Sequence, residues 1–218
     1  MNASQLMGLG VKTATAIEVA QLLPIAFQKG ELKTPHQRAA FVATCLHESQ
    51  QFSQLVENLN YSAEALLSKF HRWFDTTTAN QYGRTAEHPA DKRMIAILAY
   101  GKRKGQRTPE DGWLFRGRGW IQMTLYPQYL EAEQDLGHPY VSNPDLVATH
   151  LHGMLTSVNY WNRRNLKDKA DILAVSRIVN VGKEHTSVMP HGWAERQEYY
   201  KKCLAIYRKA DDEGFRVG

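Results

Sequence analysis

Two glutamates nine positions apart, Glu48 and Glu57, are able in principle to carry acid and base chemistry. Hydrolysis of a glycosidic bond uses two carboxyl groups across a cleft: one protonates the leaving oxygen, and the other activates water or attacks the sugar. On one continuous helix, however, these side chains would point in opposite directions and lie about 13 Å apart along the axis. If both serve one cleft, the helix must end between them, and the polar run 49–51 is a suitable place. The simpler alternative is that both are solvated surface charges.

The neighbouring pair His47 and Glu48 also raises the question of a zinc site. The zinc-protease pattern needs a second histidine four positions after the first, so that both ligands share one face of a helix. Position 51 is Gln51, and the histidines of this chain show no paired spacing. We therefore predict no metal and no cofactor.

A second segment, residues 111–124, mixes glycines, arginines and aromatic residues and ends in Gln122, Met123 and Thr124. Glycines let the backbone approach a ligand closely, and arginines bind anions or anchor nearby carboxylates. A phosphate-binding loop would end in Gly-Lys-Ser or Gly-Lys-Thr, which does not follow these glycines. An arginine-glycine segment that binds nucleic acid would be longer and less apolar. The segment fits neither alternative well.

Three blocks of this sequence resemble the family 19 glycoside hydrolases, the chitinase-like group that includes phage and prophage endolysins. The first block is residues 47–63, where His-Glu-Ser is followed by Phe52 and then by Glu-Asn-Leu-Asn-Tyr-Ser-Ala, and the second is residues 111–124. The third is residues 178–196, which match the family's Asn-Gly-Gly turn and a downstream arginine on the last helix. Together the matches span about residues 38–207, and chance does not readily produce three ordered blocks.

The resemblance implies a mainly α fold, like that of lysozymes and family 19 chitinases, and it suggests roles residue by residue. Glu48 matches the general acid, Glu57 matches the general base of an inverting enzyme, and Thr124 matches the hydroxyl residue that helps to hold the attacking water. An acid must keep its proton near neutral pH, and the place of Glu48 on an amphipathic helix favours the partial burial that this requires. The remaining matches are Gln122 and Asn180 as substrate-binding amides, Arg196 with Glu184 as a charged network near the acid, and Arg118 as further support.

Aromatic residues in and near these blocks are able to stack on sugar faces, and we take Tyr61, Trp120 and Tyr129 as substrate-binding candidates. The alternative for each ring is a place in the core, which is more usual in a small helical domain. Basic residues between positions 92 and 107 usually form a solvated face, but beside a polysaccharide site they could steer the protein to an acidic polymer.

The chain departs from the family pattern at two places near the expected sugar site. Leu125 stands where the family usually has Gly after the threonine, and Gln128 replaces an asparagine. In the Asn-Gly-Gly turn, Val181 replaces the first glycine, so we expect its backbone to avoid positive φ. Neither change touches the two glutamates.

Helices must position these residues, because apolar residues recur at helical spacing and alternation with period two is scarce. One helix is expected to end at Gly30, and a second to start at Thr34, where Pro35 and Gln37 complete a capping box. The second helix carries Glu48. Further helices are predicted over residues 63–70, 92–100, 144–162, 171–178 and 194–209, with a glycine-rich loop at 101–120.

The length of 218 residues is consistent with a single catalytic domain over 1–218, in which residues 64–110 could form a small helical lobe. We expect no separate wall-binding domain. Cys45 and Cys203 lie in apolar helical stretches and are predicted to be buried thiols rather than a disulfide bridge.

Composition and charge narrow the functional classes. Hydrophobic residues at 43% and charged residues at 22% are typical of globular proteins and exclude a disordered or collagen-like chain. No stretch approaches the roughly 20 apolar residues of a membrane span. The first 30 residues lack the basic start and apolar run of a signal peptide. We therefore expect the protein to accumulate in the cytoplasm of the producing bacterium, and to act on the wall in the periplasm with help from a factor such as a holin.

We interpret the chain as a monomeric endolysin that cleaves β-1,4 bonds between amino sugars of peptidoglycan and so lyses the host cell. The net charge of +5 suits a wall that carries carboxylates. Alternatives are a chitinase, whose substrate shares the β-1,4 N-acetylglucosamine unit, and a noncatalytic wall-binding module on the same scaffold. A nucleic-acid-binding protein is a further alternative, supported only by net charge.

Overall fold

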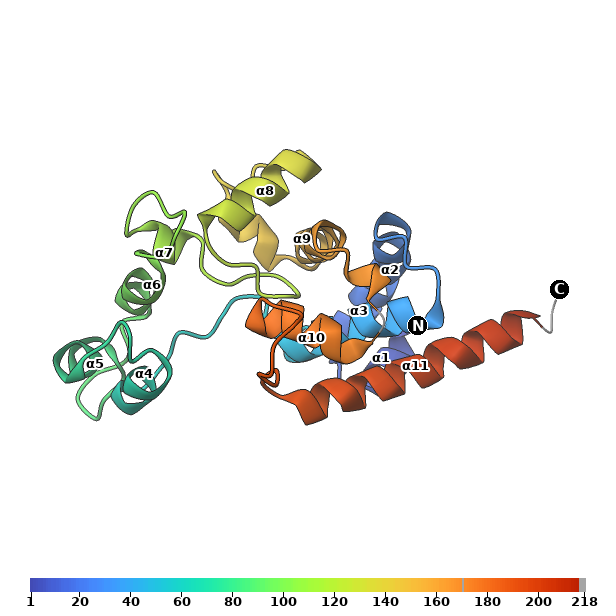
Figure 1. Ribbon diagram of the computed structural model, residues 1–218, viewed down its shortest axis with the longest axis horizontal. Coiled ribbons are helices and arrows are strands. Elements are labelled where there is room, and N and C mark those ends of the chain that lie inside the picture. The colour runs from blue at the N-terminus through green and yellow to red at the C-terminus, as the bar shows by residue number, and fades with distance from the viewer. Residues whose placement is uncertain (170, 216–218) are drawn as a thin grey trace. The chain divides into compact units, whose positions relative to one another are not determined.

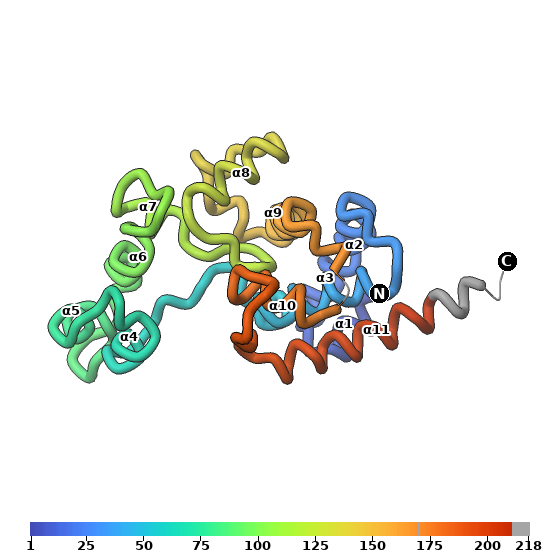
Figure 2. The backbone as a smooth tube through the Cα atoms, in the orientation of Figure 1, coloured from blue at the N-terminus to red at the C-terminus, as the bar shows by residue number. Residues whose placement is uncertain are grey.

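The computed structural model describes residues 1–169 and 171–215, which form helices joined by loops, with isolated β-bridges and no β-sheet among them (Figures 1 and 2). The chain divides into two compact units. The first unit comprises Met1–Leu55, Gly119–Ile121 and Thr149–Gly218, and the second comprises Val56–Arg118 and Gln122–Ala148. Within the described ranges, no helix is both long enough and apolar enough to cross a membrane.

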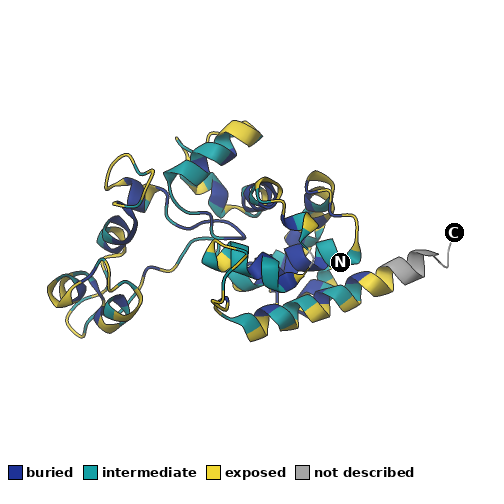
Figure 3. Ribbon diagram, viewed as in Figure 1, coloured by how far each residue is buried: buried dark blue, intermediate teal, exposed yellow. Residues whose placement is uncertain are grey.

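The first unit is organised around one buried helix, α3 (Pro35–Glu48), in which every residue from Ala39 to Leu46 is buried (Figure 3). The long helix α11 (Trp193–Phe215) packs along α3, and α10 (Ile172–Val181) contacts both. The rest of the unit consists of α1 (Ala3–Met7), α2 (Thr13–Lys29), α9 (His150–Arg163) and the 3-10 helix η2 (Leu166–Asp168). Burial on all sides explains why α3 is rich in small and apolar residues.

Local signals fix both ends of α3. At its start Thr34 Oγ1 accepts a hydrogen bond from Gln37 N at 3.2 Å, and Gln37 Oε1 accepts one from Thr34 N at 3.0 Å, which confirms the predicted capping box. The helix ends at Glu48, as expected if a break must separate the two glutamates. After the break, Gln50 and Gln51 have positive φ values of 48° and 55°.

The second unit packs around two hydrophobic clusters. One joins α4 (Ala63–Lys69), α5 (Thr76–Tyr82) and α6 (Lys92–Tyr100), with Leu66, Phe74 and Ile95 buried in it. The other lies beneath α8 (Tyr126–Leu136) and the 3-10 helix η1 (Pro144–Ala148), with Phe115 and Tyr140 among its buried members. The short helix α7 (Asp111–Leu114) packs against α6.

Most predicted helices are present, with several differences. The helix predicted over residues 144–162 is in fact two elements, because the Thr149 side chain accepts a hydrogen bond from His152 N at 3.3 Å and caps a new helix, α9. Helices α1, α5, α7 and α8 were not predicted: they bury few residues, only Ala79 in α5 and only Tyr129 and Ala132 in α8, so their apolar periodicity is weak. The glycine-rich loop at 101–120 contains α7.

The structure also bears on the predicted state of the two cysteines and on the predicted helical lobe. Cys45 and Cys203 are free and buried, which confirms the prediction of buried thiols. The expected lobe at 64–110 lies inside the second unit, which extends beyond it on both sides.

Candidate active site

In the first unit, Glu48 is bound by a buried arginine. Its side chain is 17% exposed, and Oε1 lies 2.5 Å from Nη2 of Arg196, which is 2% exposed and comes from α11. Arg196 Nε also donates to the carbonyl oxygen of His191 at 2.9 Å. The contact with Arg196 is the one expected from the sequence, and Glu48 has the partial burial expected of it.

Beside Glu48, the imidazole of His47 is fixed by two neighbours. Its Nδ1 lies 2.6 Å from Oε2 of Glu195. Gly192 packs directly on the ring: it has a φ of 68°, and a Cβ there would lie 2.4 Å from Cε1 of His47. Burial, and then the charge of Arg196, lowers the pKa of His47.

These side chains border an open pocket of about 500 Å³ in the first unit. It is lined by His47, Glu48, Gln50, Gln51, His191 and Glu195. The Glu48 carboxyl group thus contacts the buried Arg196 and also borders an open pocket in which a ligand can bind.

In the second unit, Glu57 is held by two hydrogen-bond donors. Gly117 N donates to Oε1 at 2.6 Å, and Tyr100 Oη donates to Oε2 at 2.7 Å. The backbone N of Glu57 in turn donates to the carbonyl oxygen of Gly117 at 2.9 Å. Burial, and then the charge of Glu57, raises the pKa of Tyr100 well above its ordinary value, so the phenol stays a donor. A carboxylate that accepts on both oxygens has the form a general base needs.

Glu57 also borders an open pocket of about 500 Å³, within its own unit. Trp113 and Arg116 form one part of its lining, with the Arg116 guanidinium 3.9 Å from the centre of the Trp113 ring. Burial, and then the charge of Arg118, lowers the pKa of Arg116. The other lining residues are Val56, Asn58, Leu59, Asn60 and Lys92, which offer amides and a cation to a polar ligand.

Gln122 and Thr124 lie in a strained loop of the same unit. Thr124 Oγ1 donates to the carbonyl oxygen of Gln122 at 2.9 Å, and Gln122 has a φ of 55°. The side chains of Gln122 and Glu57 both lie against Gly117, since a Cβ there would lie 3.2 Å from Gln122 Oε1 and 3.4 Å from Glu57 Cδ. The structure thus brings the side chains of Gln122 and Glu57 together beside one glycine.

Two aromatic candidates are core residues, and their assignment as sugar-stacking residues is wrong. Trp120 is fully buried, packs edge-on against Phe52 with ring centres 4.7 Å apart, and has its Nε1 3.3 Å from His150 Nδ1. Tyr129 is also fully buried, and its hydroxyl donates to the carbonyl oxygen of Arg116 at 2.8 Å. The third candidate, Tyr61, is half-buried and packs edge-on against Phe70.

The supporting residues also have definite partners. Glu184 does not join Arg196: it pairs with Lys169 at 2.7 Å, so the expected Arg196–Glu184 network is wrong. Arg118 is 1% exposed and binds Asp145 Oδ1 through Nη2 at 2.7 Å, which makes it an anchor inside the second unit. Asn180 is exposed, and its Oδ1 accepts a hydrogen bond from His191 N at 2.8 Å. Its role in substrate binding stays a prediction, as does that of Gln122.

The residues that hold the two glutamates in place carry no recognisable signal in the sequence. Tyr100 carries no motif, because it is simply the last residue of α6. Glu195 and Gly192 precede the arginine of the third block, and the φ of 68° that distinguishes Gly192 is visible only in the structure. Within the described chain, no group of three or more His, Cys, Asp or Glu residues is arranged to hold a metal ion.

Comparisons with known proteins bear on the family and the fold. No family model matches the chain. A glycosyl hydrolase family 19 domain-containing protein of Haemophilus influenzae is 34% identical over 168 residues, which cover 75% of this chain and 80% of that protein.

Two solved structures share the fold. A family GH19 class IV chitinase from Zea mays has a TM-score of 0.50 and 20% identity, over 85% of this chain and 78% of its own. A chitinase C mutant has a TM-score of 0.52 and 16% identity, over 86% of this chain and 83% of its own. The predicted fold class, mainly α and chitinase-like, is confirmed.

Proposed function

The chain belongs to glycosyl hydrolase family 19 and is therefore a glycosidase, and we propose that its substrate is peptidoglycan, cleaved at β-1,4 bonds between amino sugars. We further propose that Glu48 is the general acid and Glu57 the general base. The observation that carries these roles is the contrast between their surroundings: Glu57 accepts hydrogen bonds on both oxygens, whereas Glu48 faces a pocket beside a buried arginine.

The two surroundings suit different tasks. A base must present its carboxylate oxygens in a fixed orientation, and the donors Tyr100 and Gly117 orient those of Glu57. An acid must hold a proton and give it to the leaving oxygen, which requires that substrate binding weakens the contact between Glu48 and Arg196. Thr124, whose hydroxyl donates to a carbonyl oxygen of its own loop, is proposed to help hold the attacking water.

The choice of peptidoglycan over chitin rests on charge. The chain has a formal net charge of +5, and peptidoglycan carries lactyl and peptide carboxylates that chitin lacks. Chitin is the second candidate, because both similar solved structures are chitinases.

The test is digestion of purified peptidoglycan, followed by mass spectrometry of the products. New reducing ends on muramic acid or on glucosamine are expected, and they identify the bond that is cut. Glu48→Gln should abolish these ends, whereas Glu64→Gln, which alters an exposed glutamate of α4, should leave them unchanged. Intact glycan with freed peptides would contradict the proposal, and cleavage of chitin alone would favour the second candidate.

Access to the wall is a separate part of the proposal. We propose that the protein acts as an endolysin, released from the cytoplasm by a partner such as a holin to lyse the host. Expression with and without a holin tests this, because lysis should require both proteins. Lysis or secretion without the holin would refute it.

A further inference from the structure

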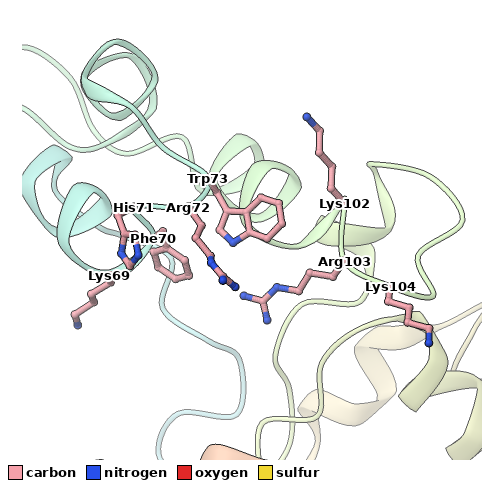
Figure 4. Close-up of a pocket in the computed structure, with 8 residues that line it drawn as sticks. All are labelled: Lys69, Phe70, His71, Arg72, Trp73, Lys102, Arg103 and Lys104. Atoms are coloured by element: carbon pink, nitrogen blue, oxygen red, sulfur yellow. The ribbon is translucent and has the colours of Figure 1, made fainter.

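A basic pocket of about 580 Å³ lies in the second unit, and its lining includes none of the residues assigned to catalysis (Figure 4). The turn after α4 and the turn after α6 form it. Its lining is Lys69, Phe70, His71, Arg72, Trp73, Lys102, Arg103 and Lys104. These described residues include five permanent cations and two aromatic rings, and they include no carboxylate.

The cationic side chains of the basic pocket lie close together, and no carboxylate lines the pocket to balance their charge. The side chains of Arg72 and Arg103 point toward one another from the two turns (Figure 4). Over the described ranges, no salt bridge involves Arg72, Lys102 or Lys104. Like charges that converge raise the energy of the free protein, and a bound anion would lower it.

One of the two arginines is already held in place. Arg103 Nε donates to the carbonyl oxygen of Ala99 at 3.1 Å, and its guanidinium lies 4.7 Å from the centre of the Tyr100 ring. These contacts leave its terminal nitrogens for a ligand. Because its guanidinium is fixed before binding, little rotamer entropy is lost when a carboxylate pairs with it.

The aromatic residues indicate what kind of anion fits. Phe70 and Trp73 are half-buried and add apolar surface beside the guanidinium groups. A fork of N–H donors next to apolar surface suits a carboxylate on an organic chain better than a bare inorganic ion. The lysines and Arg72 are exposed, so the pocket is open enough for a side group of a polymer.

We propose that the basic pocket binds carboxylate groups carried by the wall glycan, and that it raises affinity for peptidoglycan over neutral β-1,4 glycans. This inference rests on the proposed function. The carboxylates have two sources in peptidoglycan, the peptide stems and the lactyl group of muramic acid. The role is in binding, because the pocket contains neither Glu48 nor Glu57.

The test compares two variants that remove the same charge from the second unit. Arg72→Gln alters the basic pocket, and Arg84→Gln alters an exposed arginine that does not line it. KM and kcat are measured on peptidoglycan with intact stems, on peptidoglycan freed of stems by an amidase, and on a soluble chitin oligosaccharide. Arg72→Gln should raise KM on stem-bearing glycan roughly two- to fivefold, as expected for one exposed ion pair.

The substrates separate the two carboxylate sources. If the rise in KM caused by Arg72→Gln disappears when the stems are removed, the pocket binds the peptide carboxylates. If the rise persists on glycan without stems, the pocket binds the lactyl group. Neither variant should change KM on the neutral oligosaccharide, and the effect on peptidoglycan should fade at high salt. Lys104→Gln should act in the same direction as Arg72→Gln.

Three outcomes would overturn the inference. Equal effects of Arg72→Gln and Arg84→Gln would show a general charge effect, and an equal rise in KM on the chitin oligosaccharide would show a structural one. Loss of binding to lipopolysaccharide vesicles, with unchanged KM on peptidoglycan, would assign the basic pocket to a membrane surface. Failure of the proposed function is distinguishable, because the wild-type protein would then cleave no peptidoglycan at all.

Discussion

The ion pair between Glu48 and Arg196 should contribute measurably to stability, and a double-mutant cycle is able to isolate that contribution. The single variants are Glu48→Gln, which keeps the shape of the side chain, and Arg196→Met, which keeps much of its length. Each variant leaves one charged partner in a mostly buried place, since Arg196 is 2% exposed and Glu48 17%. The double variant leaves neither charge.

The magnitude follows from burial and distance. Breaking a buried pair by removing one partner costs about 3 to 5 kcal/mol, and we expect about 3 kcal/mol for Arg196→Met because Glu48 keeps some contact with water. The remaining bond from Arg196 to the His191 carbonyl is lost in both backgrounds and cancels in the cycle. The coupling energy should therefore be about 2 kcal/mol.

Urea denaturation of the four proteins gives the free energies of unfolding. Glu198→Gln is the control, because Glu198 pairs with Lys202 on the same helix but is 64% exposed, and we expect no measurable change there. Additive effects of Glu48→Gln and Arg196→Met, with coupling below about 0.5 kcal/mol, would refute the reasoning. Additivity would mean that water already screens the charges of Glu48 and Arg196 from one another.

Two further predictions concern the neighbours of the glutamates. Tyr100→Phe removes the donor to Glu57 Oε2. Because a hydrogen bond to a charged group is worth about 1.5 to 3 kcal/mol, kcat should fall roughly 10- to 150-fold. Tyr82→Phe is the control, and equal rates for both variants would count against Glu57 as the base. Burial lowers the pKa of His47, so protonation of this side chain favours the unfolded protein. The stability that depends on neutral His47 is therefore complete above about pH 6.5 and is lost as the pH falls below that value. His47→Asn should therefore flatten the loss of stability between about pH 7.5 and about pH 5.5, measured by urea unfolding, and an unchanged slope would contradict this.

The start of the central helix was predictable because a short side-chain pattern specifies it. Thr34, Pro35 and Gln37 form a capping box whose partners lie within three residues, so tertiary contacts are not needed to recognise it. The helix over residues 92–100 was predicted with its observed bounds, since it is rich in apolar residues and five of its nine residues are buried. Helices with few buried residues, such as α5, lack that pattern.

Two other charge pairs were not predictable, because they depend on contacts between distant residues. Arg118 pairs with Asp145, and Glu184 pairs with Lys169, although no local pattern links either pair. The same limit applies to the aromatic residues of the second block. A tryptophan among glycines and arginines looks like a ligand platform in sequence, but Trp120 is fully buried in the structure.

The turn that follows Glu48 shows what such a buried tryptophan does instead. Gln50, Gln51 and Phe52 have φ values of 48°, 55° and 59°, a conformation that costs residues other than glycine about 1 to 2 kcal/mol each. Ser49 stabilises the turn, since its Oγ donates to the Cys45 carbonyl oxygen at 2.6 Å and accepts from Phe52 N at 2.9 Å. Phe52 is 1% exposed and packs on Trp120, so burial of its ring offsets the strain. Trp120 therefore acts on the site through the backbone, by holding the turn that ends α3 directly after Glu48.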